Sequence, residues 1–117
     1  MCHSLDLLAH DAVNDLAVRH NQLGNIYDAA GNLGQALAHY RKGIGYNEAA
    51  GDTYGAALTR YNVALALPRR GRFANAKDYA VAALLGFEAY GEGAKEKVLK
   101  TLKLIADIEK GLKGSDE

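Results

Sequence analysis

Residues 23–40 have the sequence LGNIYDAAGNLGQALAHY, with Gly31 between two segments rich in alanine, leucine and aromatic residues. On each side of Gly31 the apolar residues recur at spacings of three and four, which is the period of an α-helix with one buried stripe. Glycine just past the last helical residue is a common helix stop, because it enters the left-handed backbone region without a Cβ clash. The stretch therefore predicts two helices joined by a short turn.

Glycine recurs along the whole chain at intervals of twenty residues. The glycines of this series are Gly31, Gly51, Gly71, Gly91 and Gly111. Between them lie good helix formers with helical apolar spacing, and no stretch shows the sustained alternation of a strand bounded by hairpin turns. The pattern predicts an all-α fold of five helices, each of roughly 15–18 residues.

A shift of forty residues superposes two central blocks of the sequence on each other. The identical positions are Ala17 and Ala57, Gly31 and Gly71, Ala36 and Ala76, Glu48 and Glu88, Ala49 and Ala89, and Gly51 and Gly91. Most of these are small residues, at which two helices can approach closely. Self-similarity at this period indicates stacked helical hairpins.

Composition and charge exclude several classes of function. The chain of 117 residues has 14 basic and 14 acidic side chains, so no net charge attracts it to nucleic acid or to an anionic membrane. Its single cysteine cannot form an intrachain disulfide, and its longest apolar run is less than half of a membrane span. These features predict a cytoplasmic protein that binds neither nucleic acid nor membranes.

The sequence contains no complete catalytic or cofactor-binding motif. The segment 86–91 has the glycine spacing of a phosphate-binding loop, but Glu92 stands where that motif requires lysine. The pair Gly43 and Gly45 lacks the third glycine of a dinucleotide fingerprint, and the four histidines form no metalloprotease motif. We therefore expect no catalytic residues, no cofactor and no metal site, and we expect the chain not to be an enzyme.

The residues around Gly31 and Gly71 resemble the tetratricopeptide repeat. The first copy of the pattern has Leu23-Gly24, Tyr27, Gly31, Ala36 and Tyr40, and the second has Val63-Ala64, Leu67, Gly71, Ala76 and Ala80. The forty-residue period and the missing closing proline are similar to a longer-helix subgroup found in kinesin light chains and spindle-orientation adaptors. The chain also resembles the C-terminal repeats of large bacterial signalling proteins. The resemblance implies a right-handed α-solenoid of two helical hairpins followed by a C-terminal capping helix.

The expected organisation has five parts. These are an N-terminal extension or remnant of a preceding helix at 1–10, a first repeat at 11–50, a second at 51–91, a capping helix at 92–113 and a disordered tail at 114–117. In the capping segment six lysines surround a single apolar stripe, which is typical of a terminal repeat that faces water.

The resemblance implies a concave groove, lined by the first helix of each repeat, that holds a peptide or a partner helix. The residues off the buried stripe of these helices are Asn21, Asn25, Asp28, Leu58, Tyr61, Asn62, Leu65 and Arg69. An asparagine amide donates to and accepts from a peptide backbone at once, and Tyr61 and Leu65 offer apolar anchors. The alternative is that the asparagines are simply solvated and that Tyr61 belongs to the core.

One binding subtype of the family can be weighed residue by residue. Its members grip a terminal carboxylate with asparagines and several cations. Asn25 and Asn62 match the amides and Lys103 matches one cation, but Asn21 and Leu99 stand where further cations are needed. A clamp that lacks half of its cations holds a carboxylate poorly, so we reject that subtype and keep Lys103 as a groove residue.

The sequence thus predicts a non-catalytic scaffold that binds a protein or peptide partner. The alternative is a self-association or sensor segment of a larger signalling protein. Leu5, Leu7 and Leu8 are apolar near the N-terminus, where the first hairpin has no preceding repeat to cover it. We expect either residues 4–10 or another chain to cover this edge, and a homodimer is one way to do so.

Overall fold

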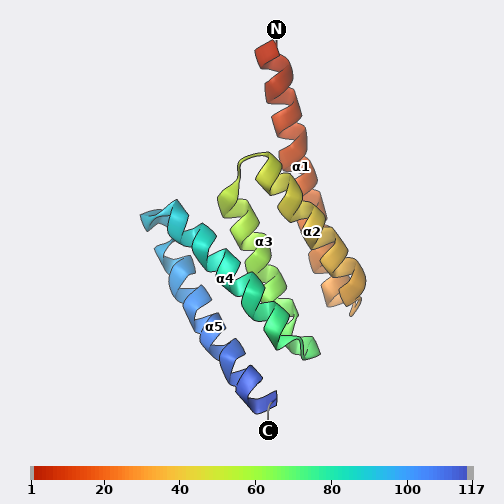
Figure 1. Cartoon of the computed structure of the whole chain (residues 1–117). Helices are drawn as coiled ribbons and strands as arrows, with labels where there is room; N and C mark the ends of the chain where they lie inside the picture. Colours follow the sequence, from red (N-terminus) through yellow and green to blue (C-terminus); the bar gives the residue numbers. More distant parts are fainter. Residues whose placement is uncertain (1, 116–117) are drawn as a thin grey trace. The chain divides into compact units, whose positions relative to one another are not determined.

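The protein's structure is a computed structural model that describes residues 2–115, with the side chains of residues 12–69 and 71–112. Within residues 2–115 it contains helices and no strand, which confirms the predicted all-α fold of five helices (Figure 1). The elements are α1 (Cys2–Ala29), α2 (Leu33–Ala49), α3 (Thr53–Ala66), the short 3-10 helix η1 (Pro68–Arg70), α4 (Phe73–Tyr90), the short 3-10 helix η2 (Glu92–Ala94) and α5 (Lys95–Ser115).

The chain divides into two compact units, Met1–Ala56 and Ala57–Glu117. The first unit contains the hairpin of α1 and α2 together with the first turn of α3. The second contains the rest of α3 and the hairpin of α4 and α5. No helix within residues 2–115 combines the length and the apolar character needed to cross a membrane.

The same type of hydrogen-bonded turn occurs at three successive helix ends. At the first, the N–H of Gly31 donates to the carbonyl of Asp28 at 3.0 Å, and the N–H of Asn32 donates to the carbonyl of Tyr27 at 2.8 Å. The same pair of bonds recurs at Gly51 and at Gly71, and φ of the three glycines lies between 74° and 84°. This is the Schellman turn, whose left-handed residue is unstrained when it is glycine. The prediction that these three glycines end helices is confirmed.

The residue after each of these glycines begins the next helix. Oδ1 of Asn32 accepts a hydrogen bond from the N–H of Gln35 at 3.2 Å, and Oδ1 of Asp52 accepts one from the N–H of Gly55 at 2.8 Å. Arg72 holds the same place before α4, where its side chain makes no capping bond. Such caps satisfy N–H groups that the first helical turn leaves without partners. One glycine and one following residue are therefore enough to end one helix and begin another.

The last two glycines of the series differ from the first three. Gly91 also has a positive φ, of 98°, and ends α4, but the chain then enters η2 before α5 begins. Gly111 lies inside α5, so the prediction that it ends a helix is wrong. A Cβ at this position would overlap the ring of Phe73. Gly111 thus allows α5 to pack closely on the start of α4.

Two glycines allow α1 and α2 to pack closely in their hairpin (Figure 1). A Cβ on Gly24 would lie 2.5 Å from Cδ1 of Tyr40, whose side chain is 1% exposed. On the facing helix, a Cβ on Gly43 would overlap the side chain of Asn21. Each glycine leaves the space that a side chain of the other helix occupies, so the two backbones approach more closely than larger residues permit.

Two helices are longer than predicted. The helix α1 has 28 residues and passes position 10 without a break, while α5 has 21 residues and continues to Ser115, inside the segment expected to be a tail. No glycine or proline precedes Gly24, so nothing in that stretch stops a helix. The side chains of Leu5, Leu7 and Leu8 lie outside the described residues.

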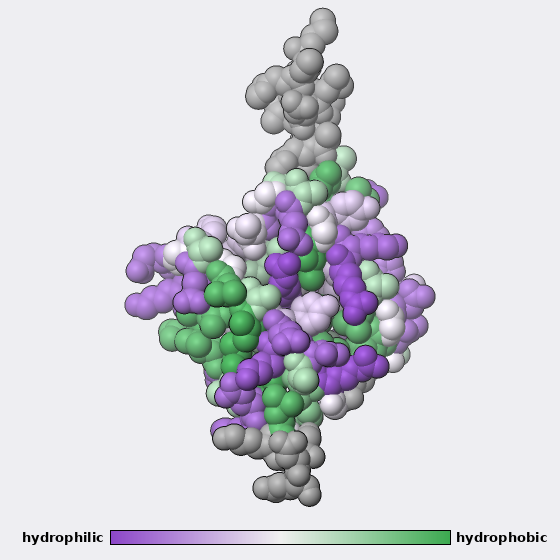
Figure 2. Space-filling model, in the orientation of Figure 1, coloured by the Kyte–Doolittle hydropathy of each residue, from purple (hydrophilic) through white to green (hydrophobic). Residues whose placement is uncertain are grey.

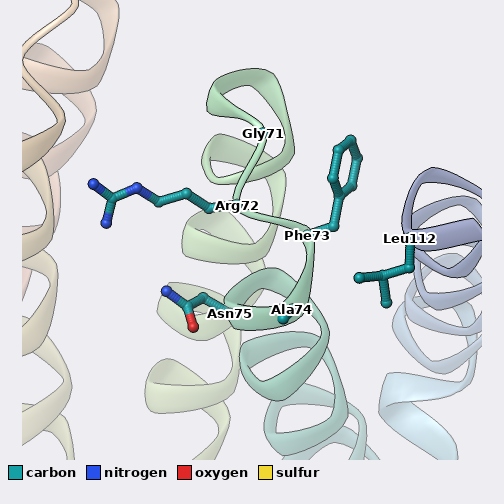
Figure 3. Close-up of a pocket in the computed structure, with 6 residues that line it drawn as sticks. All are labelled: Gly71, Arg72, Phe73, Ala74, Asn75 and Leu112. Atoms are coloured by element: carbon teal, nitrogen blue, oxygen red, sulfur yellow. The ribbon is translucent and has the colours of Figure 1, made fainter. Parts of the chain in front are cut away.

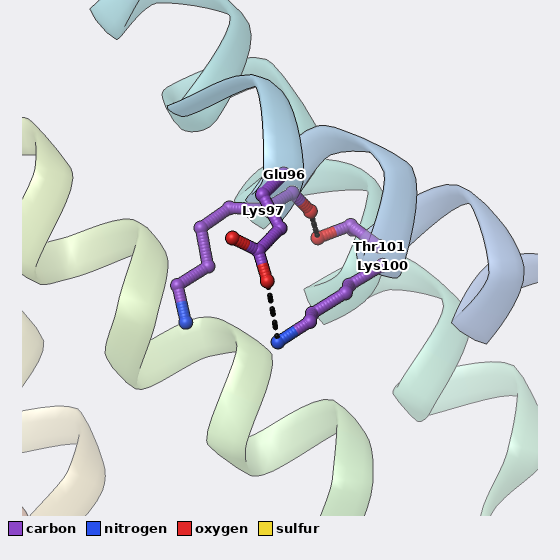
Figure 4. Close-up of polar contacts among 4 residues, drawn as sticks. All are labelled: Glu96, Lys97, Lys100 and Thr101. Carbon is purple, nitrogen blue, oxygen red and sulfur yellow. Dashed lines mark hydrogen bonds and ion pairs between the residues drawn. The ribbon is translucent and has the colours of Figure 1, made fainter. Parts of the chain in front are cut away.

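The second unit buries a stripe of alanines and one large aromatic side chain on α4. Its fully buried side chains include Ala76, Ala80, Ala83 and Phe87 from α4 and Thr101 and Ile108 from α5. The hydroxyl of Thr101 donates to the carbonyl of Lys97 at 2.7 Å, so this buried polar group is satisfied within its own helix (Figure 4). The prediction of one apolar stripe on α5 is wrong, because Leu99 and Leu102 remain 61% and 48% exposed.

We predict opposite effects of alanine at two helical glycines. Gly24→Ala should lower the free energy of unfolding by about 1–3 kcal/mol, because the added methyl collides with the Tyr40 ring. Gly45→Ala should raise it by about 0.5–1 kcal/mol, because Gly45 lies within α2 and a Cβ there meets no atom within 4 Å. Urea unfolding of both variants measures the difference, and equal effects of the two changes would contradict the close packing of α1 on α2.

Candidate functional site

A hollow of about 280 Å³ lies between α3 and α5 in the second unit. It is lined by Tyr61 and Leu65 from α3 and by Lys100, Lys103, Leu104 and Asp107 from α5. Tyr61, Leu65 and Lys103 belong to the groove residues expected from the sequence, and the structure brings these three together. We call the apolar residues of the hollow the floor and its charged residues, all of which are exposed, the rim. Ligand pockets commonly combine both kinds of residue.

The floor of the hollow is anchored in the core. The Tyr61 ring meets the ring of Phe87 edge-on, with centroids 6.5 Å apart and planes at 66°. Phe87 is fully buried, so this contact holds Tyr61 in place while part of its surface still faces the hollow. Leu65, one turn further along α3, is 41% exposed. A fixed aromatic ring beside an exposed leucine is a preorganised apolar surface.

The rim carries exposed positive charge. Lys100 pairs with Glu96 of the preceding turn at 3.2 Å, and both side chains are largely exposed. Figure 4 shows Lys97 and Lys100 extending to the same side of α5, with the Glu96 carboxylate between them. Exposed ion pairs at this spacing contribute only about 0.3–0.5 kcal/mol. Lys100 can therefore exchange Glu96 for a carboxylate of a ligand at little cost in free energy.

The other groove residues expected from the sequence do not line this hollow. Leu58 and Asn62 are half-buried on α3, and Arg69 is exposed in η1. Asp28, with Asn21 and Asn25, lies on α1 in the first unit.

The two asparagines of α1 turn toward α2. The hydroxyl of Tyr40 donates to Oδ1 of Asn25 at 2.6 Å. Oδ1 of Asn21 is buried against Gly43, and no described group donates to it. The Oδ1 atom of Asn21 is thus enclosed between the two helices, whereas Asn25 remains an exposed residue, as expected of a position off the buried stripe. Their contribution to a binding groove stays a prediction.

A ladder of four aromatic rings along the α1–α2 hairpin was not anticipated. Tyr27 lies parallel to His39, with centroids 5.3 Å apart and planes at 1°, and His20 meets Tyr46 at 5.5 Å and 19°. In the middle His20 and His39 face each other at 5.2 Å. The sequence contained a signal for this ladder. His20 and Tyr27 on α1 are seven residues apart, and so are His39 and Tyr46 on α2.

The two histidines at the centre of the ladder share one hydrogen bond, with their Nδ1 atoms 3.0 Å apart. Such a bond requires one protonated and one unprotonated nitrogen, so it cannot persist when both rings are charged. Burial lowers the pKa of His20 below its ordinary value of 6.5, and the positive charges of His39 and Lys42 lower it further. The pair is therefore an acid-sensitive element of the first unit.

A larger hollow at the start of α4 is lined by fewer charged side chains. It has a volume of about 400 Å³ and lies beside Phe73 and Leu112. Arg72 and Asn75 also line it, and in Figure 3 their side chains extend away from Phe73 and Leu112. Among the described side chains, no three of His, Cys, Asp and Glu lie together in a group that could hold a metal ion.

Comparison with known proteins adds no further assignment. The chain matches no protein-family model, no curated protein and no solved structure.

We predict that acid destabilises the first unit through the histidine pair. Because the folded pKa of His20 lies below 6.5, the unfolded chain holds more protons on this ring as the pH falls below that value. Stability present above pH 6.5 should therefore be lost as the pH falls. Urea unfolding at pH 7.5 and at pH 5.5 measures the loss, and His20→Gln should reduce it. An undiminished loss in His20→Gln would assign the acid effect to other groups.

Proposed function

We propose that this chain is a non-catalytic interaction module that binds a peptide or a helix against the hollow between α3 and α5. The observation that carries this proposal is that Tyr61, Leu65 and Leu104 line one hollow together with Lys100 and Lys103. Apolar anchors in a pocket supply most of the binding energy in such sites, while the charged rim sets orientation and choice of ligand.

The chemistry of the rim suggests which peptide binds best. An apolar side chain fills the space beside Tyr61 and Leu65, and acidic side chains next to it in the ligand replace Glu96 as partners of the lysines. Asp107, on the same rim, disfavours a second carboxylate near it. The favoured ligand is therefore an apolar residue flanked on one side by acidic residues.

We further propose that the two units form a right-handed α-solenoid of the tetratricopeptide-repeat type, with the binding hollow on its concave side and the protein in the cytoplasm. Two features support this proposal. The Schellman turns recur at twenty-residue intervals, as two-helix repeats require. The contact of Gly24 with Tyr40 joins the two positions at which the repeat pattern has a small residue and an aromatic residue.

The runner-up function is self-association through the N-terminal edge at Leu5, Leu7 and Leu8. It remains a prediction from the sequence, because these side chains lie outside the described residues.

We predict that Leu65→Asp and Lys103→Glu weaken peptide binding by different routes. Peptides selected from a random display library against the whole chain serve as probes, and fluorescence anisotropy measures their affinity. Leu65→Asp should reduce affinity about tenfold or more by removing an anchor. Lys103→Glu should reduce it most for acidic peptides and in low salt, where charge interactions are least screened.

The control for this experiment is Val18→Asp, which places the same charge on an exposed apolar position of α1. It should leave peptide affinity unchanged. Selected peptides that bind Leu65→Asp as tightly as the unaltered chain would place the binding surface elsewhere.

A further inference from the structure

The α4–α5 hairpin exposes large apolar side chains on a face that the proposed peptide site does not use. Leu85 of α4 is 63% exposed and Val81 is 39% exposed, while Leu99 and Leu102 of α5 are 61% and 48% exposed. In Figure 2 apolar side chains gather over this hairpin. Single exposed leucines are ordinary, but a contiguous apolar patch on two neighbouring helices indicates an interaction surface.

An ion pair between α4 and α5 marks the sides of the two helices on which Val81 and Leu102 lie, with Leu85 one turn after Val81 and Leu99 one turn before Leu102. Nζ of Lys77 on α4 lies 3.4 Å from Oε1 of Glu109 on α5, so these two positions meet across the hairpin. Val81 lies one turn after Lys77, and Leu102 lies two turns before Glu109, on the same sides of their helices. The residues of α5 that line the hollow toward α3, such as Leu104, lie on its other side.

At the opposite end of the apolar patch, Glu88 and Lys95 line one open hollow. Each helix thus carries a lysine toward its N-terminus and a glutamate toward its C-terminus. The helix dipole favours the reverse order, so helix stability does not account for these charges. One end of the patch thus presents Lys77 and Glu109, and the other presents Lys95 with Glu88 and Glu92, with leucines and a valine between them.

This order of charges makes the face complementary to itself. Leu102 lies seven residues after Lys95 and seven residues before Glu109. When two copies of α5 lie antiparallel about a two-fold axis at Leu102, Lys95 of each copy stands opposite Glu109 of the other. Closed two-fold interfaces require such self-complementarity, because one surface must serve both partners.

We propose that the face formed by Val81, Leu85, Leu99 and Leu102, with Lys95 and Glu109 at its ends, docks a second copy of this chain. Two hairpins pack with their apolar patches together, and the charges at the ends set the antiparallel register. The interface is distinct from the peptide site, because its four apolar residues do not line the hollow, but the two meet on α5, where Leu99 lies one turn before Lys103. It also differs from the N-terminal edge.

The first test is sedimentation velocity of the whole chain over a concentration series. The unaltered chain should form dimers, and Leu99→Glu should weaken self-association about tenfold or more by placing charge in the apolar centre. Ile26→Glu is the matched control, because Ile26 has the same exposed fraction of 61% but lies on α1. Circular dichroism confirms that each variant keeps its helices.

The second test mixes two charge-reversed chains. Lys95→Glu alone and Glu109→Lys alone each oppose like charges across the proposed interface, so each should associate less strongly than the unaltered chain. In a mixture of the two variants every such pair is again of opposite sign, and heterodimers should form. Recovery of association in the mixture identifies both the contact and its antiparallel register.

Several outcomes would overturn the proposal. A chain that stays monomeric at every concentration contradicts it, as does equal association of Leu99→Glu and Ile26→Glu. No recovery in the mixture contradicts the register. Dispersal of the dimer by Leu8→Asp and not by Leu99→Glu would assign self-association to the N-terminal edge. Loss of peptide binding in Leu65→Asp with the dimer intact separates this proposal from the peptide site.

Discussion

The turn at Gly31, repeated at Gly51 and Gly71, is the constraint on which the rest of the fold depends. In each turn, backbone N–H groups donate hydrogen bonds to carbonyls near the end of one helix, and the residue after the glycine begins the next helix. Because so few residues intervene at Gly31, the chain reverses there, and α1 packs against α2. Local backbone geometry thereby decides which helices of the first unit share buried contacts.

Close approach of the helices is the second consequence. With Gly24 against Tyr40 and Gly43 against Asn21, α1 and α2 enclose side chains that a looser pair would leave in water. The enclosure accounts for the hydrogen bond from Tyr40 to Asn25 and for the central contact of His20 with His39. Burial in this enclosure lowers the pKa of His20, so protonation of its ring opposes the packing of the first unit.

The two sides of α5 have different characters, and this difference organises the second unit. One side faces α3 and offers a small hollow with an apolar floor and exchangeable lysines. The other carries exposed leucines between charges of both signs. A helix with apolar residues on more than one side does not merely terminate a fold, because the second stripe remains available to another surface. The single-stripe expectation missed this, because it took Leu99 and Leu102 as part of the buried stripe.

The sequence by itself determined the helical class, the number of helices and three of the turns, because glycine at a left-handed position and apolar spacing act within a few residues. The helical period also placed Tyr61 and Leu65 off the buried stripe, and the family resemblance indicated Lys103; all three line the hollow between α3 and α5. Only the tertiary structure decided that Gly111 packs against Phe73, that Asn21 and Asn25 turn toward α2, and that two histidines meet. Those outcomes depend on distances between helices. The spacing of residues along a single helix does not determine such distances.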